Sequence, residues 1–235
     1  MSAPYAALRR EVLAANLEIP SRNLAILTWG NVSGFDAEAG VFAIKPSGME
    51  YAELREEDIV VLDLEGRVVA GERNPSSDTK THLELYRAFP GLGGVCHTHS
   101  PHATAWAQAR RPIPCLGTTH ADLAAGEIPC TRFLDAAELG GDYEKATGTL
   151  IIETFHGIDP LAVPAVLVAG HGPFVWGRSA REAVRNAAAL EEVARMALMT
   201  FALDPQAEEL PAHISGKHWE RKHGMGAYYG QKGQH

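Results

Sequence analysis

Three histidines stand close together directly after a short apolar run. They are His97, His99 and His102, in the segment GVCHTHSPHATAW. Side chains alternate between the two faces of a strand, so an extended chain would direct His97 and His99 to one face and Cys96 to the other. Two imidazoles on one face can bind the same metal ion at about 2.0–2.1 Å. This pair is therefore a candidate for part of a metal site.

A third candidate ligand comes from a distant part of the chain. His171 follows the apolar run AVLVAG between two glycines, and glycine lets the backbone pass close to a site. Ligands from two strand ends leave a coordination position open, as in catalytic zinc sites, whereas a structural site would favour cysteines with a spacing that is not found here. The alternative of hydrogen-bonded histidines without a ligand role is kept for His82, His102 and His120.

The elements that must position these residues follow from hydrophobic periodicity and turn residues. Helical spacing predicts a helix over residues 3–17, stopped by Pro20, and a longer one over 180–203 that begins with the capping-box pattern of Ser179 and Glu182. Two more helices are predicted in DTKTHLELYRAF and HATAWAQAR. Strands are predicted in GVFAIKPSG, GGVCHTHS, GTLIIETF and PAVLVAGHGPFVWG, with a hairpin in IVVLDLEGRVVAG.

This succession predicts one α/β domain over residues 1–235, with a central antiparallel or mixed sheet flanked by helices. Periodicity is lost over 205–235, which we interpret as a C-terminal tail. A hydrophobic content of 46% is ample for a packed core, and the formal charge of -8 argues against general nucleic-acid binding.

The chain is expected to be soluble and cytoplasmic. No apolar run approaches the roughly 20 residues that span a bilayer, and the first residues lack the apolar segment of a signal peptide. The odd number of cysteines, without a paired spacing, fits reduced thiols in a cytoplasm. We therefore expect no membrane partner.

A series of motifs in a fixed order resembles the L-ribulose-5-phosphate 4-epimerases of the class II aldolase family. The motifs are TWGNVSGFD, IKPSGMEY, PSSDTKTHLELYRAFP, GGVCHTHSPHATAWAQ, GTTHADLAAGEIPCT, VLVAGHGPFVWG and KHGMGAYYGQ, from about residue 5 to residue 231. The resemblance implies a mostly antiparallel sheet between helices and a homotetramer with active sites at subunit boundaries. It also implies an isomerase that converts L-ribulose 5-phosphate to D-xylulose 5-phosphate in pentose metabolism, such as arabinose use.

The resemblance assigns roles to individual residues. The site of Zn²⁺, or of another divalent metal, matches His97, His99 and His171, with the carboxylate of Asp78. The binding pocket for the sugar phosphate matches Asn31, Lys45, Ser47, Gly48, Ser76 and Ser77, with His218 near the same site. The acid/base pair matches Asp122 and Tyr229, and the tyrosine reaches in from a neighbouring subunit. In the related fuculose-phosphate aldolases a glutamate takes the place of Asp78, so aspartate favours an epimerase.

The chemistry of the reaction explains the need for such residues. The hydrogen on C4 of the ketose is β to the carbonyl and is not acidic, and the chain lacks the glycine motif of a nicotinamide site. Cleavage of the C3–C4 bond, rotation of the aldehyde and re-addition remain. That route needs a Lewis acid for the enediolate, a firm hold on the phosphate of glycolaldehyde phosphate, and acid/base groups on opposite faces.

Other interpretations stay open at this point. A class II aldolase would use the same metal site and release glycolaldehyde phosphate. A non-catalytic, adducin-like module would share the fold, although the intact histidines argue against it. In the structural alternative, Asp122 and the serines of PSSD are ordinary helix caps and Tyr229 is part of a disordered tail. In a metal-free aldolase, Lys45 would be the lysine that forms a Schiff base.

Overall fold

A seven-stranded sheet forms the centre of the computed structural model, which describes residues 5–228. The strand order is β4-β3-β2-β1-β5-β7-β6. The strands are β1 (Asn31–Asp36), β2 (Val41–Ile44), β3 (Val60–Asp63), β4 (Val68–Ala70), β5 (Gly94–His97), β6 (Ala165–Val168) and β7 (Gly172–Gly177). Neighbouring strands pair in antiparallel fashion. The prediction of one domain around a mostly antiparallel sheet is confirmed.

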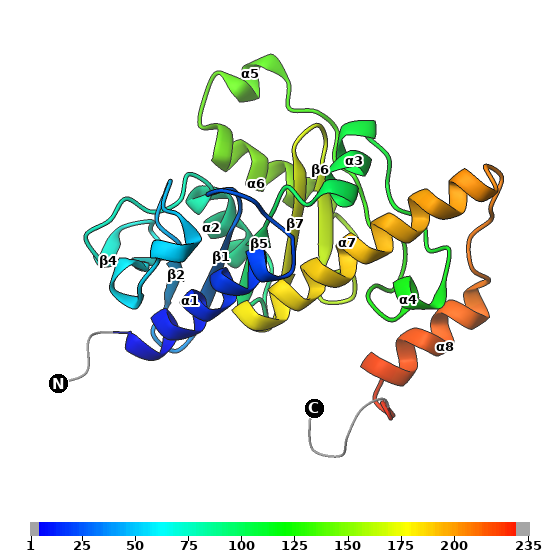
Figure 1. The fold of residues 1–235 in the computed structure, drawn as a ribbon, viewed down its shortest axis with the longest axis horizontal. Coiled ribbons are helices and arrows are strands. Elements are labelled where there is room, and N and C mark those ends of the chain that lie inside the picture. Colours follow the sequence, from blue (N-terminus) through cyan, green and yellow to red (C-terminus); the bar gives the residue numbers. More distant parts are fainter. Residues whose placement is uncertain (1–4, 229–235) are drawn as a thin grey trace.

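Helices cover both faces of this sheet (Figure 1). The α-helices are α1 (Ala6–Ser21), α2 (Thr79–Ala88), α3 (Pro101–Ala109), α4 (Thr118–Ala121), α5 (Ala136–Leu139), α6 (Tyr143–Thr154), α7 (Ala180–Leu203) and α8 (Ala212–His223). In the view of Figure 1, α1 and α7 cross in front of the sheet, and α2 and α6 lie behind it. No helix within residues 5–228 is long and apolar enough to cross a membrane.

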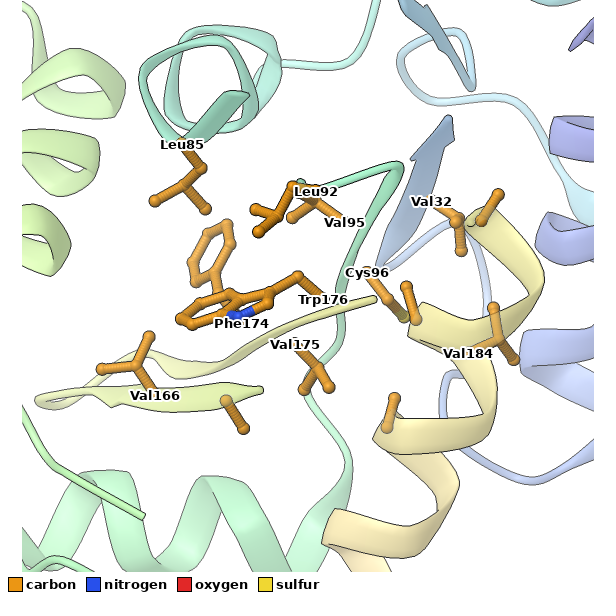
Figure 2. Packing of buried hydrophobic residues seen from close by; sticks show 14 of the residues in the cluster. Val32, Leu85, Leu92, Val95, Cys96, Val166, Phe174, Val175, Trp176 and Val184 are labelled. Carbon is orange, nitrogen blue, oxygen red and sulfur yellow. The ribbon is translucent and has the colours of Figure 1, made fainter. Parts of the chain in front are cut away.

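The core is built by the alternation of side chains along β5 and β7. Figure 2 shows Val95 and Trp176 on one side of the two strands, and Cys96 and Val175 on the other side, toward α7. All four side chains are buried. Full burial of a valine side chain such as Val95 or Val175 stabilises the fold by roughly 1.5–3 kcal/mol relative to leaving it exposed. Cys96 is therefore a packing residue, as the alternation predicts.

The start of α7 lies directly against β5 because the strand begins with glycine. A Cβ atom at Gly94 would stand 2.4 Å from the backbone nitrogen of Ala180, which no side chain can occupy without moving the helix. Ser179 then caps α7, since its hydroxyl oxygen accepts a hydrogen bond from the Glu182 N–H at 3.1 Å. The predicted helix over 180–203 is confirmed, and its position on the sheet is fixed at its first turn.

Two local predictions are wrong. The first helix does not stop before Pro20 but ends at Ser21, because a proline in the last turn removes only one helical hydrogen bond. The segment GTLIIETF is not a strand but belongs to α6. A short apolar run cannot distinguish a strand from a buried helix. Gly148 within it lets α6 approach α2, since a Cβ there would lie 2.8 Å from Cβ of Glu84.

The predicted tail contains a helix. The loss of periodicity after Pro205 conceals α8, of which no residue is buried. A helix that contributes nothing to the core has no need of an apolar face. α8 contacts the short helix α4, and the two lie together at the lower right of Figure 1.

Candidate metal centre

Three imidazole rings converge at one edge of the sheet. The nitrogen atoms of His97, His99 and His171 that are available to a metal all lie within 4.8 Å of one another. The ring centroids are separated by 5.0 Å for His97 and His99, 4.7 Å for His97 and His171, and 5.0 Å for His99 and His171. Residues that are far apart in the sequence thus meet at one point.

The backbone places each ring. β5 ends at His97, whose Cα partners are Asn31 on β1 and Phe174 on β7. The His97 ring stacks on Phe174 with centroids 4.1 Å apart. His171 stands in the tight turn between β6 and β7, where its N–H donates to the carbonyl of Val168 at 3.0 Å.

Glycine is needed in that turn for two reasons. Gly170 has φ +71°, a left-handed conformation that side chains disfavour. A Cβ atom at Gly172 would lie 2.8 Å from the carbonyl oxygen of Thr98. The turn that carries His171 therefore approaches the segment between His97 and His99 more closely than any other residue would allow.

The hydrogen bonds and protonation of these rings fit a divalent metal ion. His97 Nδ1 lies 2.9 Å from the carbonyl oxygen of Pro173 and so carries a proton, which leaves Nε2 as the free ligand atom. His97 Nε2 and His99 Nε2 are 3.1 Å apart. Two nitrogens on one tetrahedral ion would be about 3.3 Å apart. The donor set of three imidazoles with an open side suits zinc and related ions.

Electrostatics favour the neutral, metal-binding form of two of the rings. Burial, together with the neighbouring rings of His97 and His99, lowers the pKa of His171 to about 4. Desolvation by the surrounding protein, together with the neighbouring ring of His97, also lowers the pKa of His99. Neutral imidazole is the form that binds a metal, so neither ring has to lose a proton at neutral pH.

Asp78 lies beside this cluster but is not one of its converging ligands. Its Oδ2 accepts a hydrogen bond from Nδ2 of Asn31 at 2.6 Å. Burial raises the pKa of Asp78, but the nearby rings of His97, His82 and His171 and the hydrogen bond from Asn31 together lower it by more, so that the net shift is downward. An ionised carboxylate next to the histidines would add negative charge to a cation site.

A network of polar contacts between β1 and α2, next to Asp78, was not predicted from the sequence. The hydroxyl of Ser33 lies 2.7 Å from Nδ1 of His82 and 2.7 Å from the hydroxyl of Tyr86. Ser33 and Asn31 share a face of β1, and Asp78, His82 and Tyr86 recur every four residues from the start of α2. His82 thus has the hydrogen-bonded role that the sequence left open for it.

Lys45 and two loops lie near the start of α2. The Lys45 side chain is buried, and its ammonium group lies 3.4 Å and 3.5 Å from the carbonyl oxygens of Thr28 and Pro46. Burial lowers the pKa of Lys45, which Glu50 partly opposes. Within the part of the chain described, Lys45 has no carboxylate within ion-pair distance. Such an ammonium is complementary to an anionic ligand.

The two serine loops, residues 46–48 and 75–77, are held side by side. Pro46 and Pro75 form an isolated β-bridge. The Ser76 N–H donates to the carbonyl of Lys45 at 3.0 Å, and the Ser47 N–H donates to the carbonyl of Asn74 at 3.0 Å. These two backbone donors are therefore occupied. These contacts bring Lys45, Ser47 and Ser76 of the predicted pocket together, with Gly48 and Ser77 as their neighbours in the chain. Gly48 has φ +65° and no neighbouring atom where a Cβ would stand, so this loop is open.

Asp122 belongs to a separate cluster. It follows the last residue of α4, and its carboxylate accepts hydrogen bonds from Nδ1 of His218 at 3.1 Å and from Nη2 of Arg221 at 2.6 Å. Burial raises the pKa of Asp122, but Arg221, His218 and Lys222 together lower it by more. The sequence predicted Asp122 and His218 as site residues and missed Arg221, for which only the basic run KHWERKH gives a hint.

The structure does not bring Asp122 to the histidines of the same chain. The turn that carries His171 lies near the top of Figure 1, whereas α4 and α8 lie at the lower right. Tyr229, the predicted partner of Asp122, lies outside the described residues. One further side chain approaches the cluster from α6, since the hydroxyl of Tyr143 lies 3.5 Å from Nδ1 of His171. Nothing in the sequence singled out Tyr143.

Comparisons with known proteins agree on the fold. Residues 10–198 match the family model of the class II aldolase and adducin N-terminal domain. An L-fuculose 1-phosphate aldolase shares 26% identity at a TM-score of 0.79, with 94% of this chain and 97% of that chain covered. YgbL from Klebsiella pneumoniae, a candidate aldolase/epimerase/decarboxylase, shares 27% identity at a TM-score of 0.72, with 92% and 99% covered. An L-fuculose-1-phosphate aldolase from Thermus thermophilus is similar in fold, at 23% identity and a TM-score of 0.66, with 87% and 100% covered.

Proposed function

Because this chain belongs to the class II aldolase and adducin family, we propose that it is a zinc-dependent 4-epimerase that converts L-ribulose 5-phosphate to D-xylulose 5-phosphate. Enzymes of this family include lyases and epimerases, and the proposal selects one reaction among them. The observation that carries it is the convergence of three imidazoles, with their ligand atoms within 4.8 Å of one another. The ordered epimerase-like motifs of the sequence support the choice of reaction.

The metal would be held by His97, His99 and His171. When bound, a divalent zinc ion supplies Lewis-acid stabilisation of the negative charge left on the dihydroxyacetone fragment when C3–C4 breaks. The bond from His97 to Pro173 keeps one ligand nitrogen unprotonated. Asp78, fixed by Asn31, adds a carboxylate beside the cation.

The phosphate would be bound by Lys45 and the two serine loops. Cleavage leaves glycolaldehyde phosphate, which must turn about its own axis without leaving the site. A buried ammonium group and the hydroxyls of Ser47, Ser76 and Ser77 can hold one end of this fragment while the aldehyde presents its other face. Asn31, beside the metal cluster, would contact the sugar. The alternative of a Schiff-base Lys45 is disfavoured by the presence of the histidine cluster, which favours a metal-dependent reaction.

We propose that the acid/base pair is Asp122 and Tyr229, and that a second subunit delivers at least part of it. The hydroxyl on C4 loses a proton on one face and regains one on the other, so two groups are needed. The separation of Asp122 from the histidines within one chain (Figure 1) supports a homotetramer in which the segment 205–235 reaches a neighbouring active site. His218 would orient Asp122 there through the bond between them.

A cytoplasmic location is part of the same proposal. The cysteines within the described chain are unpaired, and Cys96 and Cys115 are buried. Free thiols of this kind are usual in a reducing compartment, where sugar phosphates are also found.

The decisive experiment is turnover of L-ribulose 5-phosphate by protein freed of metal and then supplied with Zn²⁺. We expect D-xylulose 5-phosphate to form only in the presence of metal. No turnover at any metal loading would contradict the proposal. Tyr229→Phe should slow the reaction by about a hundredfold with zinc still bound, and full activity in this variant would remove the tail from the mechanism.

A class II aldolase is the second candidate, because an L-fuculose 1-phosphate aldolase covers nearly the whole chain at a TM-score of 0.79. The same assay separates the two functions. Free glycolaldehyde phosphate would remain a minor product of an epimerase and would be the main product of an aldolase. Asp78 supports the epimerase, since the resemblance places a glutamate there in fuculose-phosphate aldolases.

A further inference from the structure

A carboxylate from α7 holds the first turn of α3, directly after the histidine pair. Oε1 of Glu191 accepts hydrogen bonds from the backbone N–H of His102 at 2.9 Å and from Nδ1 of the same residue at 2.7 Å. Oε2 accepts from the backbone N–H of Ala103 at 3.0 Å. The Glu191 side chain is only 16% exposed. His102, which follows His97 and His99 in the sequence, thus contributes to this contact.

These bonds replace a cap that α3 does not possess. Ser100 stands at the cap position but makes no side-chain capping bond, and the next residue, Pro101, has no N–H. The first backbone donors of the helix are therefore those of His102 and Ala103, and Glu191 accepts from both. A negative charge at this end of a helix is also favoured by the helix dipole.

The capped turn stands next to a metal ligand that lacks strand support. β5 ends at His97, and α3 begins at Pro101. His99 lies between the two and is exposed. Its backbone is thus positioned from one side by the strand and from the other side by the start of α3, whereas His97 is fixed within the sheet.

We propose that Glu191 is a positioning residue of the metal centre, which acts through the first turn of α3 to hold His99 in its ligand geometry. This inference rests on the metal-binding part of the proposed function and is independent of the substrate. Loss of the carboxylate should leave the fold in place and loosen one ligand of three.

The middle of α3 has a separate attachment to α7, and this provides a control. Trp106 Nε1 donates to the carbonyl of Ala194 at 3.0 Å in a buried position. Trp106→Phe should lower thermal stability without disturbing the first turn. Glu192→Gln is a second control, because Glu192 follows Glu191 on the same helix but pairs with Arg195 on the surface.

The experiment measures Zn²⁺ affinity of metal-free protein by competition with a chromogenic chelator, and the visible spectrum of the Co²⁺ form. We expect Glu191→Ala to weaken Zn²⁺ binding by about tenfold, the lower end of the range for residues that support metal ligands, with an altered Co²⁺ spectrum. Glu191→Gln should weaken Zn²⁺ binding less than Glu191→Ala does, and His102→Ala should weaken it least of the three. Glu192→Gln and Trp106→Phe should stay within about twofold of the unaltered protein.

Two outcomes would overturn the inference. The first is that folded Glu191→Gln and His102→Ala both bind Zn²⁺ within about twofold of the unaltered protein, while Glu191→Ala either does the same or does not fold. The contact of Glu191 with α3 would then be purely structural. An equal loss of affinity in Trp106→Phe at the same loss of thermal stability would also overturn the inference. If the unaltered protein binds no Zn²⁺, the metal site itself fails. Metal binding without epimerase activity would contradict only the proposed reaction.

Discussion

The histidine cluster and the Asp122 cluster are built in different ways. His97 and His171 owe their positions to backbone: one ends a central strand, and the other sits in a tight turn between two glycines. Asp122 instead follows a four-residue helix and is held by side chains of α8, through His218 and Arg221. The first cluster stands where strands of the central sheet end, and the second joins two peripheral elements.

This difference suggests how the two clusters divide the work. A metal ion needs ligands fixed to within a few tenths of an ångström, which strands in a sheet provide. A group that exchanges protons with a rotating substrate fragment can stand on a peripheral element. Changes in the first cluster should therefore affect metal content and activity together, and changes in the second should affect activity alone.

The largest effect is expected from His97→Ala. Loss of the metal removes several kcal/mol of charge stabilisation, so we expect turnover to fall by about a thousandfold or more. Metal content by elemental analysis should fall with it, while the far-ultraviolet circular dichroism spectrum stays unchanged. Full metal content in this variant would mean that His97 is not a ligand.

Asp122→Asn should reduce turnover by about a hundredfold, the usual scale for loss of an acid/base group. The variant should retain its zinc, because the carboxylate is not near the histidines of its own chain. Parallel measurement of kcat and metal content tests this. A loss of zinc in Asp122→Asn would break the distinction between the two clusters.

Zinc should also stabilise the folded chain. At a free concentration of about a hundred times Kd, binding to the native state contributes about 2.7 kcal/mol, or a rise in Tm of about 5–10 °C for a chain of this length. Calorimetry should show the same rise in Asp122→Asn and none in His97→Ala. An undiminished rise in His97→Ala would point to a different zinc site.

The smallest effect is expected from Arg221→Ala and concerns pH. Arg221 helps to hold the pKa of Asp122 below its usual range, so its removal raises that pKa. If Asp122 acts in its ionised form, the acidic limb of the kcat/KM profile moves to higher pH, while the rate near neutral pH changes little. Arg195→Ala, which alters a surface pair with Glu192, should leave the profile unchanged.

The sequence could predict the convergence of the three histidines because each of them carries a local pattern. Two histidines in alternation after an apolar run, and a third between glycines, are visible without a structure. The strand order of the sheet is not visible in this way, and the antiparallel class came from strand-like runs and from the resemblance. The apolar run within α6 is too short to distinguish a helix from a strand, and α8 has no apolar pattern because it buries no residue.

The polar supports could not be predicted for a different reason. The contacts of Glu191 with His102, of Ser33 with His82 and of Arg221 with Asp122 join residues far apart in the chain. No periodicity links such residues, and polar side chains on a helix are expected to face solvent. Only the packing of the elements shows which of them meet.

The turn between β6 and β7 has a consequence for the order of events in a newly made chain. While ribosomes are still synthesising the second half of the protein, an emerging polypeptide offers only His97 and His99, and a cation captured there would have two ligands and be readily released. The third becomes available after β7 has docked beside β5, a late step because contacts between distant residues form slowly. We expect the cell to load this protein with metal only once its central sheet is complete.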